Sequence, residues 1–588
     1  MIRLQDICIT LLGSIPLLVA MSSCVMEKYE DCPADPTPQE HWITLQFVMS
    51  GESAVTRANP MGGEDGNGRE DGINNENKIH DVNIFLHTCA TSLLNSYEPL
   101  PLTHLYFNLD NPTDPSNTLN FEMEEPVDDN LKDKSKVIYT VKFKNPVQDP
   151  NNPLKDIGLT PKFITLANIG KSMKGEFANL EELRSHILPN QTWESTGVAN
   201  VKGYDRFIMT SAYETNIESS LDLTPNNGSG SKEKPYFGST TLERMCARIE
   251  VMYEKSNIKD DKSELIYSVK DETTELSSVH ILNMLPVNIM SKPSFLFKKV
   301  TNGLPNDWNN VNGIEWGGRE IVDEKDVPSN YVLEPFTLIK ETLNGAELKV
   351  KMSELYGNTQ TSAVAIRIKD ASDGKVNEYY HGELRDKEFD KNTNMTILGY
   401  ANENTQSPNQ FNSNFITGIA FRAVYIPATI YGGFIDGTDE EGKTEIKFIP
   451  IDDKAKPDTI YRYSPSNQSQ LEKDCKYFSK GAVLKRYQAS HPEDIAEVTF
   501  FTPEQHDGKW GFICYYNLWL RHYNDETADP QRDYPMEYAT VRNNIYRVSI
   551  SFNGPGDPSP TMREPDTMQA RIFVRKWNYR KENKPLEF

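Results

Sequence analysis

Short stretches in which apolar and polar residues alternate recur along the chain, and they constrain the fold more than any other feature. Alternation with a period of two is typical of a β-strand with one face in a hydrophobic core. Gly, Pro, Asn and Asp separate the stretches. This pattern predicts an all-β fold built of sandwiches. Together with a buried strand expected at residues 163–167, strand signals lie at residues 43–49, 79–86, 137–143, 207–212, 242–253, 279–283, 348–352, 363–368, 420–426, 498–501, 546–552 and 571–577.

The first stretch differs from the others because a long polar segment comes directly after it. Ile43, Leu45, Phe47 and Met49 alternate with residues of the opposite face, which predicts a core strand. The polar segment, up to residue 72, is Gly-rich, so we expect an exposed tether in which a trypsin-like protease can cut after an arginine. We interpret the strand as one that is removed. On composition alone, a permanent core strand is the competing interpretation.

One helix is predicted. Asn179 can cap its amino terminus, and Glu182 three residues later completes a capping box. Leu180, Leu183 and Ile187 follow the helical period and should share its buried face. The rest of the chain carries few helical signals, which agrees with the all-β expectation.

The length of the chain predicts more than one domain. With 588 residues, two domains of roughly 200 to 300 residues are expected. We divide them at residues 58–238 and 239–588. The run 242–253 is interpreted mainly as one strand that opens the second domain.

The amino terminus resembles an export signal. Arg3 precedes an apolar run from Ile7 to Ala20, which is too short to span a bilayer and suits a signal peptide over residues 1–23. Small residues lead into Cys24, as in the lipobox of a bacterial lipoprotein, so Cys24 is the expected lipidation site. Signal cleavage near the same point with an unmodified Cys24 is the alternative. Residues 24–57 would form a propeptide that contains the removable strand.

Charge and composition exclude several function classes. The formal net charge is −23, whereas nucleic-acid binding needs a concentration of basic residues that is not visible here. The seven cysteines are scattered without a Cys-x-x-Cys pair, and the ten histidines do not cluster at ligand spacing. We therefore expect no nucleic-acid partner, no metal site and no cofactor.

One segment matches a phosphate-binding motif without its chemistry. Residues Gly437 to Thr444 fit G-x-x-x-x-G-K-[ST], which normally offers backbone N–H groups to phosphate ahead of a helix. Acidic residues inside this loop would repel phosphate, and a strand-like segment comes next. We interpret it as a hairpin turn. No nucleophile–base set can be assembled, so no enzyme is expected, and the lone His522 is interpreted as a hydrogen-bonded core or rim residue.

The carboxy-terminal sequence resembles a known family. Residues 536–554, together with Val574-Arg-Lys-Trp577, are similar to the carboxy-terminal region of Mfa-type fimbrillins, relatives of FimA that build the type V pili of Bacteroidales. Supporting matches are the lipobox at Cys24 and the segments 56–58, 163–168 and 244–248.

The resemblance implies a fold and a route to the cell surface. It implies two tandem transthyretin-like β-sandwich domains, carried by a precursor that is exported as a palmitate-bearing lipoprotein to the outer membrane. A trypsin-like processing protease would cut between Arg57 and Ala58, and the strand at residues 43–49 would then leave.

The resemblance also implies how the subunits would join. A strand of the next subunit would fill the vacated groove, and Ile572 and Val574 are the expected inserted residues of that donor strand. The partners would be other copies of the chain and accessory fimbrial subunits, in a head-to-tail extracellular fimbrium. Such a fimbrium would support adhesion to host or bacterial surfaces.

Two alternatives to a polymerising stalk subunit stay open. The segment from Cys24 to Pro33 looks like the start of the anchoring subunits, which keep their lipid and are not cut, so an uncleaved anchor or tip subunit is the first. The second is a carbohydrate-binding surface lipoprotein, which needs exposed aromatic platforms. A Trp in a β-sandwich is more often a core residue than such a platform. The candidates are Trp308, Trp316, Trp510 and Trp519.

Overall fold

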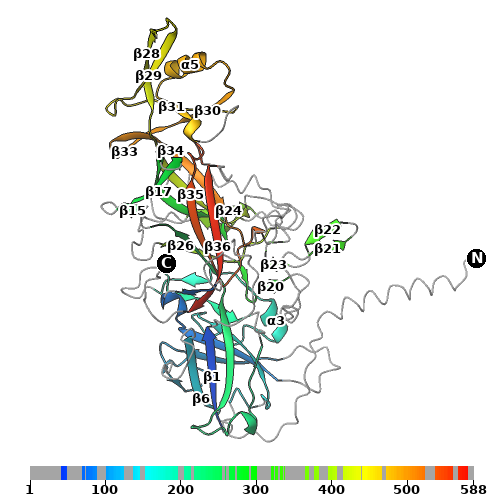
Figure 1. Ribbon diagram of the computed structural model, residues 1–588. Coiled ribbons are helices and arrows are strands. Elements are labelled where there is room, and N and C mark those ends of the chain that lie inside the picture. The colour runs from blue at the N-terminus through cyan, green and yellow to red at the C-terminus, as the bar shows by residue number, and fades with distance from the viewer. Residues whose placement is uncertain are drawn as a thin grey trace, which may run out of the picture.

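In the computed structural model, the described residues form two β-sheet units stacked along the molecule and an insert that extends from one end (Figure 1). The predicted all-β sandwich fold is confirmed. The described residues are 41–49, 69–72, 74–88, 101–124, 137–145, 152–155, 157–196, 204–212, 218–254, 258–259, 264–271, 274–290, 293–300, 319–322, 325–328, 331–335, 337, 364–369, 376–382, 395–406, 415–438, 440–466, 472–522, 537–560 and 567–579.

The first sheet gathers strands from the amino-terminal part of the chain. β1 lies in its interior, between β13 and β6, and β4 and β5 lie at its two ends. β12 (Ser219–Ser220) pairs with β7 beside this order. Across the sheet the strands are β4 (Thr103–Asn108), β3 (Asp81–His87), β7 (Lys162–Ala167), β11 (Met209–Ser211), β13 (Tyr236–Arg244), β1 (His41–Met49), β6 (Val137–Asn145) and β5 (Phe121–Glu124).

The two ends of this sheet face each other across a core. The ring of Phe107 in β4 lies 5.1 Å from that of Phe121 in β5 and 5.3 Å from that of Phe143 in β6, between centroids. Because β4 stands at the opposite end of the strand order from β5 and β6, the sheet must roll to bring these rings together. Phe107 and Phe143 are fully buried in the space that it encloses.

The second unit is a sandwich of two sheets. Tyr267 and Tyr516 of the six-stranded sheet pack on Phe552 of the five-stranded sheet, with ring centroids 5.0 and 4.5 Å apart. The five-stranded sheet has the order β2 (Arg69–Gly72), β36 (Met568–Tyr579), β35 (Asn544–Phe552), β14 (Ala247–Met252) and β26 (Met395–Ala401). The six-stranded sheet has the order β15 (Ile258–Lys259), β16 (Glu264–Asp271), β17 (Thr274–Val287), β27 (Gly418–Pro427), β34 (Lys509–Trp519) and β33 (Pro503–His506).

The insert consists of residues 431–501 and separates β27 from β33. Its sheet packs on α5 (Gly481–Ser490) around Tyr463, Phe478, Val483 and Leu484. It lies at the end of the molecule farthest from β1 (Figure 1). The order of the sheet is β29 (Thr444–Pro450), β28 (Tyr431–Thr438), β31 (Lys476–Phe478), β30 (Ile460–Pro465) and β32 (Ala496–Phe501).

Short paired strands and 3₁₀ turns complete the described structure. The pairs are β9 (Trp193–Glu194) with β10 (Arg206–Phe207), β8 (Ile187–Leu188) with β19 (Ser294–Phe295), β20 (Lys299–Val300) with β23 (Val332–Leu333), and β21 (Arg319–Val322) with β22 (Lys325–Pro328). A three-stranded sheet has the order β18 (Ile289–Met290), β25 (Val376–Gly382) and β24 (Val364–Lys369). The turns are η2 (Asn74–Asn77), η4 (Pro225–Asn227) and η8 (Glu472–Asp474).

The predicted helix is present but shorter than expected. α3 (Leu180–Ser185) begins after Asn179, whose Oδ1 accepts the N–H of Glu182 at 2.9 Å, and Leu180 and Leu183 are buried as predicted. The prediction was wrong for Ile187, which is 42% exposed and belongs to β8. The helix ends first because the backbone is already extended at His186.

The run 242–253 is two strands rather than one. β13 ends at Arg244 in the first sheet, and β14 begins at Ala247 in the sandwich. The predicted domain boundary between residues 238 and 239 falls within β13, and the division into domains stays a prediction. None of the helices in the described part of the chain is long and apolar enough to cross a membrane.

Candidate functional site

β1 is an interior strand of the first sheet. It pairs antiparallel with β6 from His41 to Met49 and parallel with β13 from Ile43 to Met49. Both backbone edges of β1 are therefore engaged in ladders. Its loss would expose unpaired N–H and C=O groups on two neighbouring strands at once.

The inward face of β1 is fully buried. Ile43, Leu45 and Phe47 have no exposed surface, and Met49 is 2% exposed. On the opposite face, Gln46 and Val48 are only half-buried. The sequence pattern predicted this strand and its apolar face, whereas removal of the strand stays a prediction.

A glycine on β13 shapes the groove in which β1 lies. Gly238 stands opposite Leu45 in the register. A Cβ at this position would lie 2.9 Å from Cδ2 of Leu45, and 3.2 Å from both Cδ1 of Leu221 and Cε1 of Phe163. The missing side chain therefore makes room for a large residue at the level of Leu45.

The predicted lipidation and cleavage residues lie outside the described part of the chain. This applies to Cys24, Arg57 and Ala58. The described chain resumes at β2, within the segment that was predicted to be an exposed tether. That prediction was wrong for residues 69–72, because β2 runs parallel to β36 with Arg69 opposite Lys576.

The predicted donor residues lie in the last strand, inside the molecule's own sandwich. β36 pairs antiparallel with β35, where Ile572 stands opposite Val548 and Val574 opposite Tyr546. Ile572 is 6% exposed and belongs to the main core. The side chain of Val574 lies outside the described set. A role of this strand as a donor stays a prediction.

A buried charge network lies where the two units meet. Glu76 of η2 accepts hydrogen bonds from Arg248 Nη1 and from the hydroxyl of Tyr400, each at 2.6 Å. Glu250 continues the network, with Oε2 at 2.9 Å from Arg248 Nε and Oε1 at 2.6 Å from Arg547 Nε. Both carboxylates are fully buried. The network therefore ties η2, the first described turn after β2, to three strands of the sandwich.

Both arginines of the segment 244–248 bind groups at this junction. Arg244 donates from Nε to the backbone oxygen of Glu76 at 3.0 Å and also binds the side chain of Asn77. Burial lowers the pKa of Arg244 to about 10, although the nearby Glu76 opposes that shift. Burial also raises the pKa of the Cys246 thiol between these arginines, so it is an inert core residue. The sequence pattern singled out this segment but indicated none of its contacts.

The Arg542-Asn543-Asn544 turn joins the same junction. Asn543 has a positive φ of 56°, and its N–H donates to the backbone oxygen of Cys246 at 2.9 Å. Arg542 is fully buried and pairs with Glu403 at 2.7 Å. Asn544 donates from Nδ2 to the backbone oxygens of Val541 and Arg542. These hydrogen bonds and the ion pair therefore fix the backbone at the start of β35.

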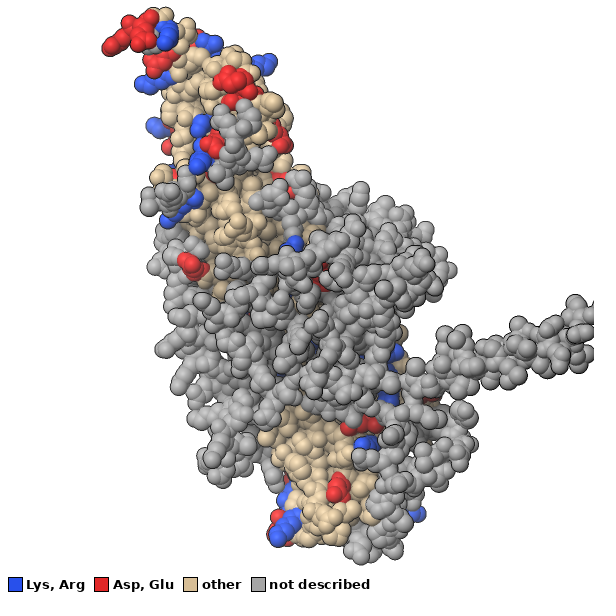
Figure 2. Space-filling view, turned by 45° about the vertical axis from the view of Figure 1, so that its right-hand side comes forward, with Lys and Arg blue, Asp and Glu red and all other residues tan. Residues whose placement is uncertain are grey.

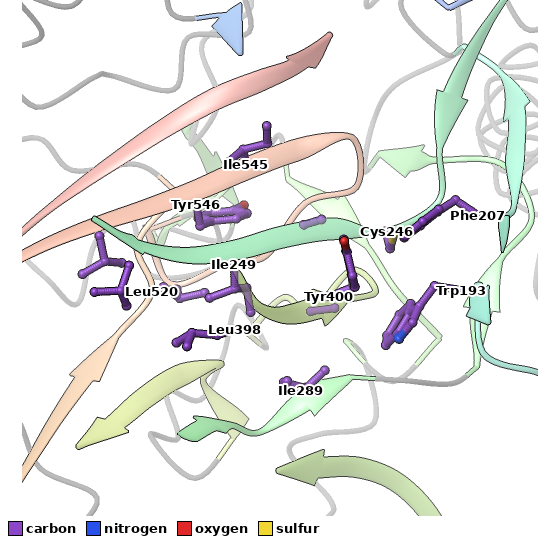
Figure 3. Packing of buried hydrophobic residues seen from close by; sticks show 14 of the residues in the cluster. Trp193, Phe207, Cys246, Ile249, Ile289, Leu398, Tyr400, Leu520, Ile545 and Tyr546 are labelled. Carbon is purple, nitrogen blue, oxygen red and sulfur yellow. The ribbon is translucent and has the colours of Figure 1, made fainter. Parts of the chain in front are cut away.

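The cores of the two units are continuous at this junction. Figure 3 shows Trp193, Phe207 and Tyr400 gathered near Cys246. The ring of Tyr400 lies 4.8 Å from that of Phe207 and 6.2 Å from that of Trp193, between centroids. The two units therefore share one apolar cluster.

The remaining candidate residues have structural surroundings. The hairpin interpretation of Gly437–Thr444 is confirmed, because β28 and β29 are antiparallel neighbours that pair up to Thr438 opposite Thr444. His522 is a buried core residue whose Nδ1 lies 2.8 Å from the hydroxyl of Tyr546. Trp510 and Trp519 are buried, so they do not form exposed sugar platforms. Trp308 and Trp316 lie outside the described residues.

Comparison with known proteins identifies the carboxy-terminal region. Residues 511–583 match the family described as "Major fimbrial subunit protein type IV, Fimbrillin, C-terminal". This match contains β35 and β36 and the turn before them. No curated protein matches the chain.

Solved structures of fimbrial proteins resemble the chain at low identity. A fimbrilin (FimA) from Porphyromonas gingivalis has 12% identity and a TM-score of 0.32, covering 92% of this chain and 99% of its own. The tip fimbrial protein Mfa3 from the same organism has 9% identity and a TM-score of 0.28, covering 92% of this chain and 100% of its own. TM-scores below 0.5 do not by themselves establish a shared fold. The likeness to fimbrillins is thus carried by residues 511–583, which match the carboxy-terminal region of that family.

Proposed function

We propose that the protein is a structural subunit of a cell-surface fimbrium that polymerises by exchange of β1. The precursor would be exported as a lipoprotein on Cys24 and cut between Arg57 and Ala58. β1 would then leave its groove, and a strand of a neighbouring subunit would take its place. The observation that carries this proposal is the position of β1: an interior strand with a fully buried apolar face.

The energetics of the groove support a replacement rather than a simple loss. Burial of the four inward side chains of β1 contributes about 6 to 12 kcal/mol, at roughly 1.5 to 3 kcal/mol each. Without β1, β6 and β13 also lose one ladder partner each. An empty groove is therefore unstable in water, and a strand with suitable alternate side chains would bind it strongly.

The geometry of such a contact produces a filament. The groove lies in the first sheet, whereas the proposed donor residues Ile572 and Val574 lie in the sandwich. Donor and acceptor are different surfaces of one chain, so the contact is head-to-tail. A head-to-tail contact that does not close into a ring continues indefinitely.

The proposal is tested by the amino-terminal residue of protein extracted from the cell surface. A polymerising subunit should begin at Ala58 and migrate as a ladder of oligomers on a gel. Monomeric surface protein that retains Trp42 would contradict the proposal.

The insert favours one second candidate, a subunit at the end of the fimbrium. Among the described residues, Ile435, Ile495 and Phe500 in or beside the insert are the most exposed large hydrophobic side chains, at 57, 72 and 60%. Three such exposed apolar side chains on one small unit favour an interaction surface on the insert. Charged side chains also stand at this end of the molecule (Figure 2). Antibodies against the insert should decorate only fibre ends for a terminal subunit, and the whole fibre for a stalk subunit.

A further inference from the structure

We propose that His280, His506 and Asp507 form a binding site for a divalent transition-metal ion. Each residue offers one ligand atom, and these three atoms lie within 4.8 Å of one another. His280 comes from β17, whereas His506 ends β33 and Asp507 begins the turn to β34. This site is independent of β1 and of strand exchange.

The ligand chemistry selects the class of metal. Two imidazoles and one carboxylate are the donors that Zn²⁺ and neighbouring first-row ions accept, while hard ions such as Ca²⁺ prefer oxygen alone. Three protein ligands leave at least one coordination position for water or another group. The site is therefore expected to bind Zn²⁺ or Co²⁺ and to discriminate against Ca²⁺.

The distances allow a metal after a small movement. Tetrahedral Zn²⁺ with ligands at 2.0–2.1 Å places those ligands about 3.3 Å apart. The three ligand atoms lie up to 4.8 Å apart, which is wider than this spacing. The two imidazole rings stand edge to face, with their centroids also 4.8 Å apart. His506 is half-buried and Asp507 is exposed, so side-chain rotations of these two residues can close the difference.

The buried member of the site is already oriented. His280 is 5% exposed, and its Nε2 lies 3.0 Å from Oγ of Ser278. If Nε2–H donates to this hydroxyl, Nδ1 carries the lone pair that a metal needs. A partner on the second ring nitrogen is the usual support for a metal-binding histidine. Ser278 is therefore a positioning residue.

The turn that carries the other two ligands is also rigid. Asp507 and Gly508 both have positive φ, at 50° and 76°, as in the tight turns that join two-residue hairpins. The hairpin closes with His506 opposite Lys509. Asp507 and His506 are consecutive in this turn, so their backbone positions are fixed relative to each other.

A metal at this site would connect segments that the sheet itself keeps apart. β17 and β33 are separated by β27 and β34 in the strand order. β33 begins directly after the insert ends at Phe501 (Figure 1). The ion would therefore clamp the chain that leaves the insert onto the sandwich, and we expect it to stiffen the base of the insert.

Titration of the full chain with Co²⁺, followed by its visible absorption, tests the proposal. The wild type should bind one equivalent, and Zn²⁺ should displace it and raise the melting temperature. Ser278→Ala should weaken binding about 10- to 100-fold, as loss of the hydrogen-bond partner of a ligating histidine does. His506→Ala and Asp507→Asn should each weaken it at least as much. Asn tolerates the positive φ of residue 507, and both side chains are at least partly exposed, so these variants should fold.

His491→Ala is the matched control, because His491 stacks on Tyr487 in the insert and lies outside the site. This variant should bind Co²⁺ like the wild type. The melting temperature of each variant in a chelator is its own metal-free reference. The rise above that reference caused by Zn²⁺ should match the wild type in His491→Ala and be smaller in the other three variants. Absence of saturable Co²⁺ binding to the wild type would overturn the proposal. So would equal weakening by His491→Ala and His506→Ala.

Discussion

Substitution of Phe47 by alanine should loosen β1 selectively. Phe47 has no exposed surface and belongs to the main core. Truncation of a buried Phe to Ala costs about 3 to 5 kcal/mol. At about 1.36 kcal/mol for each factor of ten, the equilibrium retention of β1 should fall by roughly two to four orders of magnitude.

The matched control is Val48→Ala on the other face of the same strand. Val48 is half-buried, and its loss should change the stability by about 1 kcal/mol or less. Both variants keep the backbone ladders of β1 with β6 and β13. The comparison therefore isolates the inward side chain from the hydrogen bonds.

The assay needs a defined cut between β1 and the rest of the chain. A recognition sequence for a specific protease, placed at residues 53–58, makes the cut independent of the proposed processing at Arg57. After cleavage, the urea concentration at which the β1 peptide separates from the protein is read by size-exclusion chromatography and mass spectrometry. Phe47→Ala should release the peptide at a much lower urea concentration than Val48→Ala. Release of both at the same concentration would refute the role of the inward face.

Three further predictions concern buried polar groups. Burial raises the pKa of Asp81 from 3.8 to about 6. The charged form of Asp81 therefore destabilises the folded state by about 3 kcal/mol above pH 6. Asp81→Asn should raise the free energy of unfolding at pH 8, and this gain should vanish below pH 4. Glu76→Gln should lower that free energy by about 3 to 5 kcal/mol in urea unfolding, whereas Glu181→Gln on the exposed side of α3 should change it by less than about 0.5 kcal/mol. Burial lowers the pKa of His522 from 6.5 to about 3. The unfolded chain therefore binds a proton at His522 more readily than the folded chain, and the folded state loses stability as the pH falls from 6.5 towards 3. His522→Asn should reduce this acid sensitivity of the melting temperature.

Local sequence patterns predicted the elements that depend on local chemistry. The alternation at residues 43–49 predicted β1, and Asn179 with Glu182 predicted the start of α3. α5 escaped prediction because Lys480 provides no side-chain cap and the helix opens with Gly481. Where the signal for an element is in neighbouring residues, the pattern is sufficient.

The errors occurred where distant residues decide the structure. The run 242–253 contains no Gly or Pro, yet the chain leaves one sheet and enters another at Met245 and Cys246. Their backbone groups bond to Ile208 and Asn543, both remote in sequence. No spacing rule could have found these partners.

The same limit applies to the candidate sites. Glu76 binds Arg248 only because η2 packs against β14. The ring of His280 contacts that of His506 only because the β33–β34 hairpin bends towards β17. The two histidines showed no ligand spacing in the sequence, because the strand of His280 precedes the insert and the strand of His506 follows it. Contacts of this kind follow from topology and not from local pattern.

The topology also determines what any replacement for β1 must satisfy. β1 has one parallel neighbour and one antiparallel neighbour, so a strand inserted in the reverse direction would again meet one of each. Backbone pairing alone therefore does not select the direction or register of an incoming strand. The space over Gly238 selects the direction and register, because it favours a large apolar side chain at the level of Leu45. The chain downstream of the proposed cut is held separately, by β2 on β36 and by Glu76 in the junction network. Departure of β1 would thus leave these contacts intact, and the groove would select its next occupant by side-chain fit.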